Sequence, residues 1–116
     1  MIKEFYAGVF IHIDVRYQDY EEIKDSDEFY ENVIEENFLM PYQGLEELSI
    51  LIPNDGRYSL NKDRYEEFYL TELNFTNLER AFKNDNKEIL EEIFKYFDES
   101  LVKIKSGVVS YWDEEA

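Results

Sequence analysis

The chain has 116 residues with 28 acidic and 12 basic side chains, a formal net charge of −16 at pH 7. Hydrophobic residues make up 44% and aromatic residues 17% of it, which excludes the low-hydrophobicity type of disordered chain. We therefore expect one compact domain, residues 1–116, with a single core. Cysteine is absent, which excludes disulfides, thiolate metal sites and cysteine nucleophiles.

The charge and the apolar pattern also indicate where the protein acts. A strongly negative chain is repelled by nucleic acid and by anionic lipid, so we expect direct binding to neither. No run of about 18 apolar residues is long enough to span a membrane. The first residues lack the basic region of a signal peptide. These features favour the cytoplasm.

The first predicted element is a long half-buried strand from Phe5 to Tyr17, because apolar and polar residues alternate over this stretch. The pattern places His12 on its polar face. Residues 19–22 form an acidic connection. The sequence Asp25-Ser26-Asp27-Glu28 matches a capping box and predicts a helix of about three turns that ends before Met40-Pro41.

The middle of the chain predicts a hairpin. Alternating apolar residues from Leu48 to Ile52 indicate a strand, and Pro53-Asn54-Asp55-Gly56 is a strong turn signal. Residues 57–60 are then the return strand. The stretch from Arg64 to Phe75 suits either a strand or a helix, and we favour a strand.

The last third predicts helices and then strand. Thr76-Asn77-Leu78-Glu79 is a second capping box, and Asp85-Asn86-Lys87-Glu88 predicts an interruption or restart of the helix it opens. An apolar stripe follows from Ile89 to Phe97. Residues 102–112 predict one or two strands, with Gly107 at a bulge or turn. Residues 113–116 are predicted to be a frayed acidic tail.

Hairpins dominate this order, and no crossover unit repeats. The predicted fold class is therefore α+β, a small single domain with an antiparallel sheet of about four strands and two or three helices packed on it.

The negative charge is concentrated in one segment. Between Asp19 and Asp55 there are twelve acidic residues and one basic residue, Lys24, which leaves a net charge of −11 in 37 residues. On a helix, acids four residues apart, such as Glu31 and Glu35, lie about 5–6 Å from each other. A row of carboxylates at this spacing can occupy an Arg- and Lys-lined groove that normally holds phosphates.

Aromatic residues in the same segment add possible anchors, because Tyr is enriched at binding hot spots. Two alternatives stay open: the helix face is acidic only for solvation, and the rings cover sheet faces. The candidate partner-binding residues are Asp27, Glu28, Glu31, Glu35, Glu36, Glu46, Glu47, Tyr20, Tyr30 and Tyr42.

Catalytic signatures are not found in the sequence. His12 is the only histidine, and although Asp14 is near, no nucleophile or glycine-rich oxyanion loop accompanies them. Carboxylate pairs are too abundant to single out two for catalysis. No calcium loop, phosphate loop or dinucleotide fingerprint occurs. We therefore predict no catalytic residues, no metal and no cofactor.

In charge and length the chain resembles the small acidic inhibitors made by phages and mobile elements, some of which mimic nucleic acid to block restriction enzymes or CRISPR effector nucleases. The resemblance implies a non-enzymatic, anti-CRISPR-like inhibitor whose partner is a basic nuclease or defence effector. The alternative is an immunity protein that neutralises a cognate basic nuclease toxin. A structural or regulatory phage protein, whose charge serves only solubility, is a further class. Whether inhibition is by occlusion or allostery stays open.

Overall fold

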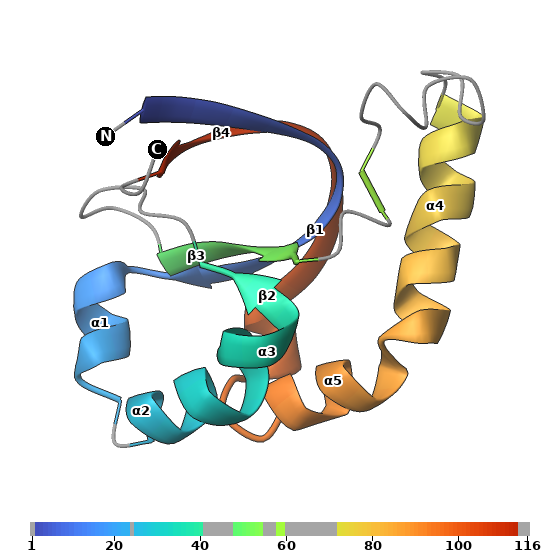
Figure 1. Cartoon of the computed structure of the whole chain (residues 1–116). Coiled ribbons are helices and arrows are strands. Elements are labelled where there is room, and N and C mark those ends of the chain that lie inside the picture. Colours follow the sequence, from blue (N-terminus) through green and yellow to red (C-terminus); the bar gives the residue numbers. More distant parts are fainter. Residues whose placement is uncertain (1, 24, 41–47, 55–57, 60–71, 114–116) are drawn as a thin grey trace.

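The computed structural model describes residues 2–23, 25–40, 48–54, 58–59 and 72–113 (Figure 1). It confirms the predicted fold class: an α+β domain with a four-stranded antiparallel sheet in the order β2-β3-β1-β4. The described elements are β1 (Ile2–Val15), α1 (Tyr17–Glu21), α2 (Ser26–Phe29), the π-helical segment η1 (Tyr30–Ile34), α3 (Glu35–Asn37), β2 (Phe38–Leu39), β3 (Leu48–Pro53), α4 (Glu72–Asp85), α5 (Lys87–Ile93), the 3-10 helix η3 (Glu99–Leu101) and β4 (Val102–Asp113).

The two long strands β1 and β4 pair without a shift in register, from Ile2 opposite Asp113 to Ile13 opposite Val102. β4 is thus a single strand, and Gly107 lies at no bulge. Gly107 faces Gly8, and residues other than glycine rarely adopt their φ angles of 140° and 152°. Both strands curve strongly together (Figure 1).

The predicted hairpin after β3 is wrong. Ser59 forms an antiparallel bridge with Gly8 of β1, the strand that β3 also pairs with in antiparallel fashion. The chain therefore continues along β1 instead of reversing against β3. Gly8 permits this close approach, since a Cβ there would collide with the carbonyl oxygen of Tyr58. The turn residues 55–57 lie outside the described residues.

Both faces of β1 are buried between Gly8 and Ile13, which corrects the prediction of a half-buried strand over this stretch. On one face Val9, Ile11 and Ile13 belong to the main core beneath the helices. On the other, Tyr6 and Phe10 form a second cluster with two residues of β3, and His12 is only 8% exposed. The sequence pattern cannot show this second cluster, because it depends on how the sheet curves.

The first helical region begins earlier than predicted and changes helix type along its length. Residues 19–21, expected as part of a connection, belong to α1, and Tyr17, expected at the end of the first strand, begins this helix. The segments α2, η1 and α3 run without a break from Ser26 to Asn37, so the predicted helix is confirmed. The predicted capping box is not confirmed, because the Asp25 side chain makes no hydrogen bond to the start of the helix.

The favoured strand at residues 64–75 is wrong where it can be compared. Residues 72–75 belong to α4, and 64–71 lie outside the described residues. Thr76 lies inside α4 and does not cap it. The predicted restart of the helix near Asn86 is confirmed, because α5 begins at Lys87. The Asn86 side chain does not cap α5 but donates to the carbonyl of Phe82. Residue 113 ends β4 opposite Ile2, and 114–116 lie outside the described residues.

Candidate functional site: the acidic surface

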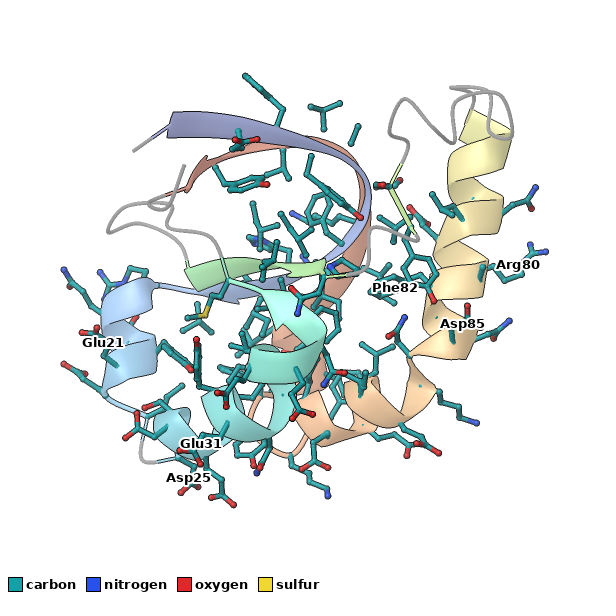
Figure 2. All side chains as sticks on the ribbon, in the orientation of Figure 1. Glu21, Asp25, Glu31, Arg80, Phe82 and Asp85 are labelled. Atoms are coloured by element: carbon teal, nitrogen blue, oxygen red, sulfur yellow. The ribbon has the colours of Figure 1, made fainter. Side chains whose placement is uncertain are left out.

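The acidic residues of the first helical region all lie on the outside of the molecule. Figure 2 shows Glu21, Asp25 and Glu31 pointing away from the core at the same end of the domain. We call this set the acidic surface. Its members, each exposed, are Asp19, Glu21, Glu22, Asp25, Asp27, Glu28, Glu31, Glu35 and Glu36.

Packing of the helix fixes this orientation. Phe29, Val33 and Ile34 are at most 2% exposed and point into the main core. The Phe29 ring lies 5.1 Å from that of Phe97, measured between centroids, and 5.3 Å from that of Tyr96. Because the apolar stripe is held in place, the remaining positions of the same helix must face solvent.

Little positive charge balances the acidic surface. Arg16 Nε donates to Asp19 Oδ2 at 3.0 Å, and both side chains are largely exposed. That hydrogen bond and the Asp19 charge raise the pKa of Arg16. Among the described residues, this is the only ion pair on the acidic surface. The other eight carboxylates of this surface form no ion pair with a described base.

The middle of the helix is π-helical, a form that occurs mostly as short insertions and often at functional sites. It includes Tyr30, which is 45% exposed and lies between Glu28 and Glu31 in the sequence. Asn32 in the same segment donates to the Tyr96 hydroxyl at 3.4 Å. The arrangement leaves one large ring accessible within a strongly negative surface.

The structure brings together six of the ten predicted partner-binding residues. Five are the exposed carboxylates at positions 27, 28, 31, 35 and 36, and the sixth is Tyr30. Glu46, Glu47 and Tyr42 lie outside the described residues. The structure also adds exposed acids that were not among the candidates, Asp19, Glu21, Glu22 and Asp25, because α1 ends next to α2. The density of acids between residues 19 and 55 was the signal that could have included them.

Tyr20 is a correction. Its side chain is only 6% exposed, and its ring packs against those of Phe29 and Phe97. The hydroxyl donates to the carbonyl of Ser26 at 3.0 Å. Tyr20 therefore ties α1 to the start of α2 and offers no ring to a partner.

A second surface feature lies on the other side of the domain. A groove of about 830 Å³ runs between α4, α5 and β4. Figure 2 shows Arg80 at this side pointing outward, while Phe82 points from α4 into the core. Among the described residues, three bases and three acids line the groove and balance in charge: Arg80, Lys83, Lys87, Glu79, Glu91 and Glu99.

His12 is buried in the sheet opposite Lys103 and Ile50, not exposed on a polar face as predicted. In the part of the chain that the structure describes, no three His, Asp or Glu side chains gather as a metal site. Its helices are all too short or too polar to cross a membrane.

Comparison with protein-family models, with curated proteins and with solved structures found no match. Function is therefore inferred from the acidic surface itself.

Proposed function

We propose that this protein is a non-enzymatic inhibitor that binds the basic nucleic-acid-binding surface of a bacterial nuclease or defence effector in the manner of anti-CRISPR proteins. The observation that carries the proposal is the acidic surface: nine exposed acids between Asp19 and Glu36, with the described base beside them already paired. Its place of action is the cytoplasm of the host cell.

The partner follows from charge complementarity. Proteins that hold nucleic acid line their grooves with Arg and Lys, which neutralise phosphates. Glu28, Glu31 and Glu35 are all exposed and follow one another at intervals of three and four residues along one continuous helical stretch, so they present several negative charges close together. A field of one sign also accelerates encounter with a basic protein.

Rigidity and an aromatic anchor support the same proposal. The helix carrying the carboxylates is held by buried Phe29, Val33 and Ile34, so little backbone order has to be gained on binding. Exposed Tyr30 supplies the kind of ring that is common at interface hot spots. Acids then accelerate association, and the ring adds contact area.

The experiment compares two variants of equal charge. The first combines E28K, E31K and E35K on the acidic surface. The second combines E88K, E91K and E99K, three exposed acids elsewhere. Each raises the net charge from −16 to −10. Both are used with the wild type as bait in a nuclease-treated bacterial lysate, and captured proteins are identified by mass spectrometry.

We expect the wild type and the second variant to capture the same nuclease, and the first variant to lose it. A captured nuclease is then assayed directly, and its inhibition should weaken steeply as salt rises, because exposed charges are screened. Capture by all three proteins would contradict a role for the acidic surface. A basic toxin encoded next to this chain, recovered as the target, would identify an immunity protein instead.

A further inference from the structure

Tyr30 is an exposed aromatic ring among the carboxylates of the acidic surface. Its side chain is 45% exposed, whereas Phe29 before it and Ile34 four residues after it are at most 2% exposed. Among the described residues, the other exposed aromatic rings are Phe5 on β1 and Phe94 directly after α5, both outside the acidic surface. The core takes in the neighbours of Tyr30 and leaves this ring to solvent.

The backbone places a carboxylate one helical turn to either side of this ring. The Tyr30 amide donates to the carbonyl oxygens of Ser26 and Asp27, so Asp27 lies on the turn before it. The Glu35 amide donates to the Tyr30 carbonyl, a five-residue step that closes the π-helical turn of η1. Glu35 therefore lies one turn after Tyr30. Asp27 and Glu35 are both exposed, and neither forms an ion pair with a described base.

An exposed tyrosine ring between two carboxylates fits arginine better than lysine. The planar guanidinium stacks on an aromatic face and keeps its N–H groups free to bond carboxylates at the edge of the ring. The lysine ammonium is a compact, strongly hydrated point charge without such a plane. Side chains of a helix point back toward its N-terminus, which directs the Tyr30 ring toward the turn of Asp27 and the Glu35 carboxylate toward the turn of Tyr30.

We propose that Tyr30, together with Asp27 and Glu35, binds an arginine side chain of the basic partner, and that this contact makes the acidic surface selective for arginine over lysine. The inference rests on the proposed function, because it names the group that the acidic surface takes from the nucleic-acid-binding groove of the partner. The other carboxylates attract both kinds of base through charge. The ring supplies the selectivity, and a cation–π contact at an exposed site changes affinity by about two- to fivefold.

The experiment compares two blocked peptides of equal charge, hexa-arginine and hexa-lysine, each titrated into the full chain at low salt by isothermal calorimetry. The measured quantity is the dissociation constant of the lysine peptide divided by that of the arginine peptide. We expect the wild type to favour arginine, and Y30L to lower this ratio by about two- to fivefold. Leucine keeps apolar bulk but has no ring face, whereas Y30F keeps the ring and should keep the ratio.

Matched controls separate the ring and its two carboxylates from the rest of the surface. F94L changes an exposed ring outside the acidic surface, where Phe94 is 36% exposed, and should leave the ratio unchanged. D27N/E35Q should lower the ratio. E28Q/E31Q removes the same charge from the same helical stretch and should weaken both peptides equally.

A ratio that Y30L leaves unchanged overturns the proposal, and so does a wild type that binds the two peptides equally or binds neither. Capture of a nuclease by the wild type, together with a ratio that does not depend on Tyr30, would reject the arginine contact and leave the proposed function standing. A ratio lowered by Y30L and kept by Y30F, with no nuclease captured, would support the arginine contact and reject the proposed function.

Discussion

Gly8 and Gly107 face each other across β1 and β4, and both have a positive φ angle. Their surroundings differ. A Cβ on Gly107 would meet nothing within 4 Å, whereas a Cβ on Gly8 would collide with the Tyr58 backbone. Val9 N also donates to the Tyr58 carbonyl at 3.0 Å, which fixes that segment against β1. One glycine of the pair is therefore needed for conformation alone, and the other for conformation and space.

The two alanine substitutions should separate these requirements. G107A should lower the free energy of unfolding by about 1–3 kcal/mol, the range for a strained backbone residue. G8A should add about 1–3 kcal/mol of overpacking to a similar strain. Urea denaturation of both variants measures the difference, and equal losses would show that the contact with Tyr58 relaxes without penalty.

The Tyr58 hydroxyl joins residues 58–59, which pair with β1, to the end of α4. It donates to Asp85 Oδ2 at 2.8 Å, and its ring lies 4.9 Å from that of Phe82. Y58F keeps the ring and removes the hydrogen bond, so we expect a loss of about 1–2 kcal/mol in unfolding free energy. Y30F, at an exposed ring, is the control and should change it by less than about 0.5 kcal/mol. An equal effect of the two substitutions would contradict a structural role for the bond.

Neighbouring aromatic residues should differ strongly in their contribution to stability. Phe29 is 1% exposed and packs against three other rings, while Tyr30 is 45% exposed. F29A should lower the unfolding free energy by about 3–5 kcal/mol, a large part of the 5–15 kcal/mol typical of a domain. Y30A should change it by about 0.5 kcal/mol or less. Thermal melts monitored by circular dichroism test this, and comparable losses would place Tyr30 in the core as well.

Asp98 should make a pH-dependent contribution to stability. Its carboxylate accepts a hydrogen bond from the Ser100 backbone amide at 2.9 Å at the start of η3, and this bond lowers its pKa. A lowered folded-state pKa stabilises the protein above the unfolded value, about 4. The contribution is lost as the pH falls from there through the lowered pKa.

D98A should therefore melt below the wild type at pH 7, and the gap between the two melting temperatures should narrow as the pH falls below about 4. A gap that is the same at pH 7 and pH 3 would mean that the charge of Asp98 contributes nothing.

The sequence was sufficient to predict an element where that element follows from the periodicity of neighbouring apolar residues. The strand predicted from Phe5 to Tyr17 is confirmed as far as Val15, and the apolar spacing of Phe29, Val33 and Ile34 predicted a helix that exists. Exposure of Glu28 and Glu31 followed from the same spacing. These are local properties, set by which residues fall on one face of a strand or helix.

Local signals failed where contacts distant in sequence compete with them. Asp55-Gly56 predicted a reversal, but residue 59 pairs with β1, where Gly8 leaves room for it. Tyr20 has the composition of an interface anchor, yet it is buried against Phe97, a residue 77 positions away. Neither outcome can be derived from neighbouring residues.

By itself, the sequence determined the large negative charge, its concentration in residues 19–55, the α+β class and the outward direction of the helical carboxylates. Only the tertiary structure decided that both faces of β1 are buried between Gly8 and Ile13, that Tyr20 belongs to the core and that residue 59 pairs with β1. The reason is physical: charge and periodicity belong to the chain, whereas burial depends on which distant segments pack together.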